Sequence, residues 1–420
     1  MPARSHRRAT TIDGTDSIAA AYTFRIWLYQ HMPVMVFLFG FGASAGSFLN
    51  VVIHRLPEGR SVLTPPSRCP VCSAGLKWYD NLPILGWFLL RGRCRYCRAR
   101  IPARYMAIEL LMAAVFVGLY AALFLTPPDM AWWGEVGGVW WYRSQIPIAW
   151  PSYVALAFLL CGLVAVTIID ARTFLIPLQI PAFVTASAFV LYTIQSLLPE
   201  SSAVAELWPI PVPPPQWSLA ALLAVAGLGL STLLMWFGVL RPSFADYEEY
   251  VEEGETIGDY PHARREMWVE LVFLTPCLVG LMAGYWLGEG LDAAATPGLL
   301  DGLGAAALGF LVGGGVVWAI RIVFTFLFGR EAMGMGDVHL LAAVGAVLGW
   351  RDPLWVFFLA PIIALGWMVV AGGVARMLRA ERRELPFGPH LAVMTALVIV
   401  CRPAVNWAEA YLVEAYQPIM

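Results

Sequence analysis

The sequence is poor in charged residues. Asp, Glu, Lys and Arg make up 13% of its 420 residues, about half the share that is usual in a soluble domain. Apolar residues make up 59%, and the mean hydropathy is +0.68. This composition excludes an ordinary soluble protein and predicts an all-α, polytopic bundle of transmembrane helices in a lipid bilayer.

Other signals are missing as well. The sequence has no Gly-rich phosphate-binding loop and no long internal repeat, and its net charge is only -2. Nothing in it points to a nucleic-acid partner, and none is expected. Cysteine is scarce, and three of the seven cysteines lie alone in apolar runs, where we expect them to pack in the core: Cys161, Cys277 and Cys401.

Apolar runs predict about eight to ten transmembrane spans. They cover residues 32–52, 105–125, 152–169, 176–198, 217–240, 267–287, 302–328, 338–350, 354–375 and 388–401. The run 338–350 reaches only about 20 Å at about 1.5 Å per residue, so we expect it to start inside a cavity. The first run follows a basic tail and contains Ala43-Ser44-Ala45, as a cleaved signal peptide would. Its length favours a retained first span instead.

The placement of basic residues predicts the topology. Residues 54–104 contain ten Lys/Arg and only two acids, so this loop is expected on the cytoplasmic side. Alternating from there, the cytoplasmic connections hold nineteen Lys/Arg and the outer segments hold three. The N-terminal tail, placed outside with four arginines, goes against this trend.

Three connecting stretches have a distinctive composition. Residues 129–151 are rich in Trp and Pro, as expected of an interfacial aromatic belt, with a ligand-stacking surface as the alternative. Residues 199–216 form a Pro-rich outer linker. Residues 243–266 hold eight acids, which we interpret as a solvated amphipathic loop.

Four cysteines form two close pairs in the loop 54–104. Two residues separate Cys69 from Cys72 and Cys94 from Cys97, and 21 residues separate the pairs. This spacing is typical of four thiolates around one tetrahedral metal, and disulfides are disfavoured in the cytoplasm. We predict a structural zinc, because four thiolates leave no open position for catalysis. An iron–sulfur site and paired redox thiols are the alternatives.

Two aspartates stand where apolar runs end. Asp170 ends the run 154–169, and Asp337 ends Gly334-Met335-Gly336-Asp337 after the run 302–328. The topology puts both at the cytoplasmic face. Two carboxyls that meet cannot both ionise easily, so one keeps a proton and the other acts as a base that activates water for peptide hydrolysis. Gly334 and Gly336 would let the backbone approach a substrate closely. Alternatively, each aspartate caps a helix or lies in interfacial water.

The chain resembles the type IV prepilin peptidase family, membrane aspartic proteases with a Gly-x-Gly-Asp motif. The matching stretches follow in family order: residues 46–57, the paired cysteines, Asn81-Leu82-Pro83, Arg91-Gly92-Arg93-Cys94, Ile101-Pro102-Ala103-Arg104-Tyr105 with Glu109, Asp170 with Ile176-Pro177, Gly334-Met335-Gly336-Asp337 with Leu340-Leu341-Ala342-Ala343, and Pro386-Phe387-Gly388-Pro389.

The resemblance implies a reaction and a location. Family members remove the basic leader of type IV prepilins or type II secretion pseudopilins at the cytoplasmic face of the bacterial inner membrane. Asp170 and Asp337 match the catalytic pair. Many members also N-methylate the new amino terminus with S-adenosylmethionine, and Gly92 matches a position associated with methylation. The implied cofactors are therefore structural zinc and S-adenosylmethionine.

The chain departs from the family pattern in three places. His339 stands where the family usually has Lys, and Leu178 replaces a polar residue. The interval between the two aspartates is long, with 166 intervening residues, which fits an inserted two-span hairpin at 217–287. The predicted domains are thus a tail (1–31), a first span (32–53), a cytoplasmic zinc-binding loop (54–104) and a peptidase bundle (105–420).

Two other functions remain open at this point. One is a Gly-x-Gly-Asp peptidase for other substrates, without methylation. The other is a non-catalytic membrane assembly or transport protein that retains the fold.

Overall fold

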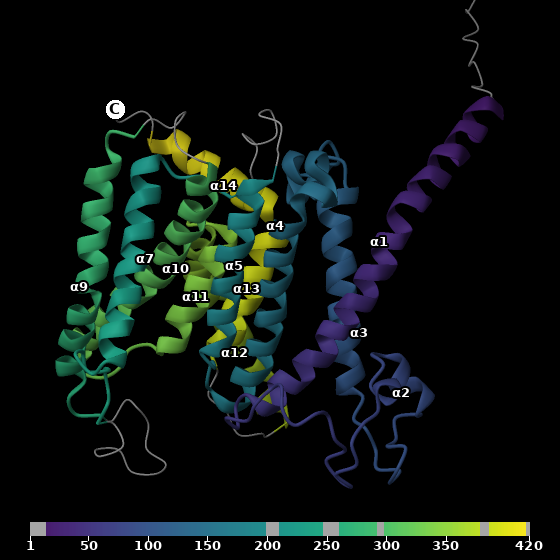
Figure 1. The fold of residues 1–420 in the computed structure, drawn as a ribbon, viewed down its shortest axis with the longest axis horizontal. Helices are drawn as coiled ribbons and strands as arrows, with labels where there is room; N and C mark the ends of the chain where they lie inside the picture. Colours follow the sequence, from purple (N-terminus) through teal and green to yellow (C-terminus); the bar gives the residue numbers. More distant parts are fainter. Residues whose placement is uncertain (1–13, 199–209, 247–259, 292–297, 379–385, 417–420) are drawn as a thin grey trace, which may run out of the picture. The chain divides into compact units, whose positions relative to one another are not determined.

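Long helices dominate the computed structural model (Figure 1), which describes residues 14–198, 210–246, 260–291, 298–378 and 386–416. Over these ranges no strand is present, so the prediction of an all-α protein is confirmed. The helical elements are α1 (Gly14–Arg55), η1 (Trp78–Asp80), α2 (Leu85–Leu89), α3 (Arg104–Tyr120), η2 (Ala121–Leu125), α4 (Ala131–Thr173), α5 (Gln179–Leu197), α7 (Pro215–Trp236), α9 (Ala263–Gly288), α10 (Gly298–Phe328), α11 (Met335–Leu348), α12 (Asp352–Leu378), α13 (Gly388–Val400) and α14 (Arg402–Tyr416).

The number of spans agrees with the prediction of eight to ten. Among the described residues, eight helices are long and apolar enough to cross a membrane. A ninth span is possible if α13 and α14, which meet at a bend of 82°, form one broken crossing. Helix α11 is apolar but too short to be counted as a span, as its sequence predicted. The chain is therefore a multi-pass membrane protein.

Two segments predicted as connections are helical instead. Helix α1 starts at Gly14, inside the expected polar tail, because residues 17–28 are rich in Ala and other helix-compatible residues. The Trp/Pro segment 129–151 lies largely within α4, whose backbone leaves helical geometry at Gly138 and Gln145. The predicted aromatic belt is only partly right: Trp140 and Trp141 are buried, because their rings pack inside the fold.

Parts of two predicted connections lie outside the described residues. These are residues 199–209 of the outer linker and residues 247–259 of the acidic loop.

Two compact units make up the chain. Unit 1 comprises residues 1–48 and 67–120, and unit 2 comprises residues 49–66 and 121–420. In unit 1, α1 packs closely on α3: a Cβ added at Gly46 would lie 2.6 Å from the Cα of Glu109. Unit 1 thus joins α3 and most of α1 to the cysteine loop, whereas the domain boundaries predicted from sequence remain a prediction.

Helices α7 and α9 form a tightly packed hairpin in unit 2, and they lie side by side in Figure 1. Gly280, Gly284 and Gly288 recur every fourth residue and form one face of α9. A Cβ at Gly284 or at Gly288 would lie 2.5 Å from a Cα of α7. Small residues at this spacing let two helix backbones approach closely, as is common between membrane helices. The hairpin is therefore a rigid element, and α10 packs beside it.

Candidate active site and metal centre

Three helix ends of unit 2 carry the residues of the candidate active site. Asp170 lies in the last turn of α4, which ends at Phe174 in the left-handed conformation. Asp337 lies in the first turn of α11, three residues after the N-cap residue Gly334. Gly388 is the first residue of α13.

Asp170 and α13 are joined by a hydrogen bond. The N–H of Gly388 donates to Oδ2 of Asp170 at 3.0 Å, and the Asp170 residue is only 5% exposed. The first N–H groups of a helix have no partner within that helix and favour a negative charge. A Cβ on Gly388 would lie 2.6 Å from Oδ2 of Asp170, so glycine is needed for this approach. The start of α13 thus supplies one donor that favours the ionised form of Asp170.

Ile176 links the same three elements. A Cβ on Gly336 would lie 2.9 Å from the Cβ of Ile176, and a Cβ on Gly388 would lie 3.1 Å from its Cδ1. Ile176, in the turn between α4 and α5, therefore packs between the starts of α11 and α13. This packing brings the segments that carry the two aspartates close together in unit 2.

The carboxyl of Asp337 is close enough to Asp170 for their charges to interact. Burial, and secondly the negative charge of Asp170, raise the pKa of Asp337 to about 7. Asp337 belongs to the short helix α11 and not to one of the eight spans. A carboxyl with such a pKa is about half protonated at neutral pH, so the pair can present one acid and one base.

The two glycines of the Gly-x-Gly-Asp turn differ in their surroundings. Gly336 is required because Ile176 packs against it, which is a structural reason and not the substrate approach expected for it. Gly334 has an extended backbone, with φ of -69° and ψ of 143°. Among the described residues, the neighbour nearest to a Cβ added there is Oδ2 of Asp337, 4.0 Å away. Close approach of a substrate at Gly334 remains a prediction.

Two histidines lie near the aspartates. Nδ1 of His339 donates to the carbonyl of Met335 at 2.8 Å, so the residue that departs from the family pattern binds its own helix. Nδ1 of His390 similarly donates to the carbonyl of Pro386 at 2.9 Å. His390 also interacts electrostatically with Asp170, and it is buried. His390 thus belongs to the surroundings of Asp170.

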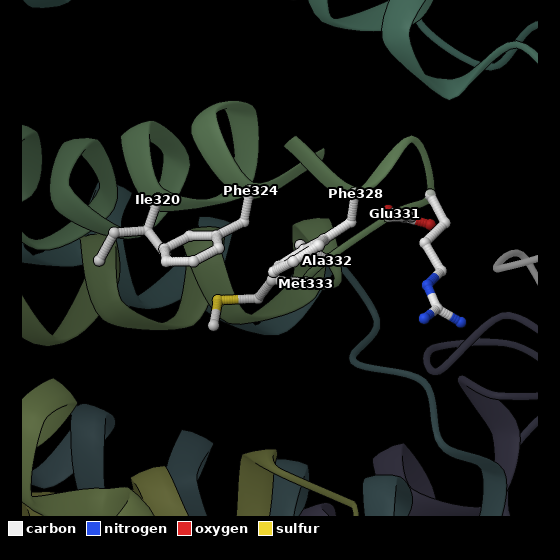
Figure 2. Close-up of a pocket in the computed structure, with 7 residues that line it drawn as sticks. Ile320, Phe324, Phe328, Glu331, Ala332 and Met333 are labelled. Atoms are coloured by element: carbon white, nitrogen blue, oxygen red, sulfur yellow. The ribbon is translucent and has the colours of Figure 1, made fainter. Parts of the chain in front are cut away.

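A cavity of about 460 Å³ lies beside the segment that leads to Asp337. Figure 2 shows Ile320, Phe324 and Phe328 along α10, with Met333 of the following segment below them. Arg330, Glu331 and Ala332 complete the lining. The cavity is therefore mainly apolar and has charged residues at one end.

Several residues of this region were not predicted as functional. Gly388 was part of a quoted motif without a role, and His390, Arg321 and Glu270 were not singled out. A signal was present for two of them, because Arg321 and Glu270 are charged residues inside predicted apolar spans.

The four paired cysteines come together in unit 1. Their sulfur atoms all lie within 4.8 Å of one another, and those of Cys69 and Cys97 are 3.8 Å apart. Sulfurs about 2.3 Å from one tetrahedral zinc would be about 3.8 Å apart. All four thiols are free of disulfides. The geometry and the donor atoms therefore fit a metal ion such as zinc.

The two cysteine pairs have the same local backbone. The N–H of Cys69 donates to Ala74 and that of Cys94 donates to Ala99, at 3.0 and 2.8 Å. The residue after each second cysteine, Ser73 or Arg98, has a positive φ. Each pair thus forms a turn that brings its two sulfur atoms close together.

Gly92, predicted to contact S-adenosylmethionine, has a conformational role in the same loop. Its φ is +64°, and a Cβ would lie 2.9 Å from the ring of Trp87. Its N–H donates to the carbonyl of Trp87 at 2.9 Å, and its carbonyl accepts from Ile101 at 2.7 Å. These contacts explain the glycine without a ligand, so its cofactor role stays a prediction.

Comparison with known families gives two matches. The bacterial Peptidase A24 N-terminal domain matches residues 40–123, which include the cysteine loop. The type IV leader peptidase family matches residues 266–369, which include Asp337 but not Asp170. The second match begins inside α9 and does not include α7, so the inserted hairpin at 217–287 stays a prediction.

Curated relatives are similar over most of the chain. A prepilin leader peptidase/N-methyltransferase from Aeromonas salmonicida is 27% identical over 87% of this chain and 89% of its own length. One from Dickeya chrysanthemi is also 27% identical, over 94% of this chain and its whole length. One from Klebsiella pneumoniae is 29% identical over 75% of this chain and 85% of its own length.

No solved structure matches the chain. The family matches and the similarity to these relatives agree with the helical membrane fold, the cysteine cluster and the Gly-x-Gly-Asp turn. The chain thus matches the type IV leader peptidase family over residues 266–369 and is similar, over most of its length, to proteins named prepilin leader peptidase/N-methyltransferase.

Proposed function

We propose that the chain is a membrane aspartic endopeptidase with Asp170 and Asp337 as its catalytic pair. Its substrates are type IV prepilins or type II secretion pseudopilins, whose leader it removes at the cytoplasmic face of the bacterial inner membrane. The observation that carries this proposal is the meeting of α4, α11 and α13 around Ile176, which puts the two carboxyls within electrostatic reach of each other.

The surroundings of the two carboxyls suggest separate roles. Asp170, which accepts the N–H of Gly388, acts as the base and takes a proton from water as the water oxygen attacks the scissile carbonyl carbon. Asp337 gives its proton to the carbonyl oxygen, forming a tetrahedral diol. The C–N bond then breaks as the amine nitrogen takes the proton from Asp170, and a diol hydroxyl returns a proton to Asp337.

The location at helix ends suits a substrate with a basic leader and an apolar helix. The apolar part of such a substrate lies in the bilayer and its leader lies in the cytoplasm. Its cleavage site is therefore at the boundary, where the predicted topology puts Asp170 and Asp337.

N-methylation of the new amino terminus is proposed as a second activity, with S-adenosylmethionine as the methyl donor. It is supported by the names of the relatives and by the N-terminal family match over the cysteine loop. Zinc bound by Cys69, Cys72, Cys94 and Cys97 would hold that loop in shape. Gly92 is the residue that we propose near the methyl donor.

Substitution of either aspartate tests the peptidase assignment. We expect Asp170→Asn and Asp337→Asn each to lower the rate of prepilin cleavage by about a hundred- to ten-thousand-fold, because each removes one partner of acid–base catalysis. The measurement is the gel shift of a purified prepilin incubated with enzyme in detergent. Asp129→Asn, at an exposed position, is the matched control and should cleave normally.

Three results would separate the alternatives. Normal cleavage by both aspartate variants would refute the catalytic pair. A wild-type enzyme that cleaves other membrane substrates but no prepilin or pseudopilin would favour a peptidase of different specificity. A cellular role that persists in both variants would favour a non-catalytic assembly or transport protein.

Mass spectrometry of the mature pilin tests methylation. An unmodified amino terminus would refute the proposed methyltransferase activity.

A further inference from the structure

Arg321 is a buried cation about two turns before the end of an apolar helix. It lies in α10 and is 1% exposed. A charged side chain inside a membrane span is costly unless it is paired, and such residues usually have a function. The hydrogen-bond partners of Arg321 therefore indicate which parts of the fold it holds together.

The guanidinium of Arg321 holds the segment between α10 and α11. Its Nε donates to the carbonyl of Met333 at 2.9 Å, and its Nη2 donates to Oε1 of Glu331 at 2.7 Å. Its Nη1 forms a short hydrogen bond with Oε1 of Glu270, on α9. One planar side chain thus joins α9 and α10 to two residues of this segment.

A second side chain of α10, that of Thr325, binds Ala332, which lies between Glu331 and Met333. The hydroxyl oxygen of Thr325, which is fully buried, accepts the N–H of Ala332 at 3.2 Å. Residues 331, 332 and 333 are therefore each tied to α10. Gly334 follows directly and caps α11, and its carbonyl accepts the N–H of Asp337 at 3.2 Å. The anchored segment ends four residues before Asp337.

Two residues of helix α9, Glu270 and Arg264, form hydrogen bonds with α10. The second oxygen of Glu270 accepts the indole N–H of Trp318 at 2.7 Å, so both carboxylate oxygens are held. Arg264, also on α9, donates to the carbonyls of Phe326 and Leu327 at 2.9 and 3.3 Å and closes the end of α10. The α7–α9 hairpin therefore supports the segment that leads to the Gly-x-Gly-Asp turn.

We propose that Arg321 is a positioning residue for Asp337, and that the α7–α9 hairpin serves the peptidase by holding Arg321 through Glu270. This inference rests on the proposed function of Asp337. A displacement of about 1 Å at a reacting group can lower a rate about a hundredfold. The anchored segment limits such displacement because its three residues cannot move independently of α10.

The experiment separates positioning from stability. Arg321→Met alone leaves two buried carboxylates without their cation, which is destabilising, whereas neutral replacement of all members of a buried ion pair is often tolerated. The test variants are therefore Arg321→Met and the triple variant Arg321→Met, Glu270→Gln, Glu331→Gln. The matched control is the double variant Arg402→Met, Asp352→Asn, which removes another ion pair of unit 2, between the buried Asp352 and the half-buried Arg402.

For each full-length variant in detergent we would measure the thermal midpoint, and kcat and KM for prepilin cleavage. We expect the triple variant to regain the thermal midpoint lost by Arg321→Met while its kcat stays about tenfold to a hundredfold below wild type. KM should change less than about twofold, because binding groups are not removed. The Arg402 and Asp352 control should keep a near-normal kcat.

Hydrogen exchange gives a readout that does not depend on activity. Peptides covering residues 329–337 should exchange faster in the triple variant than in the control. If the triple variant regains kcat together with stability, or if its exchange in this segment equals that of the control, Arg321 has only a structural role and the proposal is wrong.

A milder substitution keeps the inference testable if the Arg321 variants do not fold. Thr325→Val removes the acceptor of the Ala332 N–H without changing the shape of the side chain. We expect kcat to fall at least about threefold, since a misplaced segment misorients Asp337. Thr395→Val, which removes a buried hydroxyl that donates to the carbonyl of Leu391 in its own helix, is the control. Equal kcat values for these two variants would overturn the proposal.

Asp337→Asn distinguishes this inference from the proposed function. If Asp337→Asn still cleaves prepilin, the catalytic assignment fails, whatever the Arg321 variants do. If Asp337→Asn is inactive while the triple variant cleaves normally, the catalytic assignment stands and only the positioning role fails.

Discussion

At the scale of single residues, the two aspartates differ because of the helix ends beside them. Asp170 ends α4 and accepts an N–H from the start of α13, whereas Asp337 lies in the first turn of a short helix. Burial and the charge of Asp170 then raise the pKa of Asp337 to about 7. Two chemically identical side chains can take opposite roles in acid–base catalysis when their surroundings differ in this way.

Gly388 is the residue at which this arrangement can be tested. Gly388→Ala would put a methyl group 2.6 Å from Oδ2 of Asp170, closer than a van der Waals contact allows. We expect the carboxylate to move and kcat for prepilin cleavage to fall at least about tenfold. Gly366→Ala is the control, because no atom of the described residues lies within 4 Å of its added Cβ. That control should cleave normally and gain up to about 1 kcal/mol in stability.

One result would contradict a catalytic role for the contact between Gly388 and Asp170. If Gly388→Ala cleaves prepilin as fast as Gly366→Ala does, the contact between α13 and Asp170 has no part in catalysis.

At the scale of elements, the cysteine loop and the α7–α9 hairpin are held in different ways. The hairpin relies on close backbone packing along a glycine face of α9. The loop has only short helices, α2 and η1, between its cysteine pairs. A small polar segment of this kind buries little apolar surface, so a bound metal would provide much of its folding free energy.

Loss of a cysteine ligand should therefore unfold the loop. We expect Cys69→Ser and Cys94→Ser to lower the zinc content of the purified protein from about one ion per chain to near zero. Faster hydrogen exchange over residues 67–103 should accompany the loss. Cys401→Ser, outside the cluster, should keep both properties of the wild type. Unchanged zinc content in the cluster variants would disprove the metal site.

At the scale of the whole molecule, sidedness determines what the enzyme can reach. The turn after α4 and the segment before α11 are on the cytoplasmic side in the predicted topology, which rests on nineteen basic residues against three. The connection after α9 is then on the outer side. An active site on the opposite face could not reach a leader that remains in the cytoplasm.

Cysteine labelling tests this topology. In a cysteine-free background with the labelled residue added back, Glu289→Cys should react with a membrane-impermeant maleimide in intact spheroplasts. Arg172→Cys should react only after the membrane is opened. Both positions are exposed on the protein surface, so failure to react reports the membrane and not burial. Reaction of Arg172→Cys in sealed spheroplasts would reverse the proposed orientation.

Much of the fold and of the candidate site could be predicted from local sequence. Apolar runs predict membrane helices because a bilayer requires about 20 apolar residues per crossing. The paired cysteines predict a metal site because the spacing within each pair forms a turn with two thiolates. Asp170 and Asp337 were found because an acid at the end of an apolar run is unusual.

Contacts between distant segments could not be predicted in the same way. Several contacts depend on which helices become neighbours. They are the burial of Trp140 and Trp141, the packing of Ile176 between α11 and α13, and the hydrogen bond from Gly388 to Asp170. Arg321 is the clearest example, because its partners lie on α9 and in the segment before α11. Hydropathy and spacing describe each segment separately, whereas these contacts depend on packing between segments far apart in the chain.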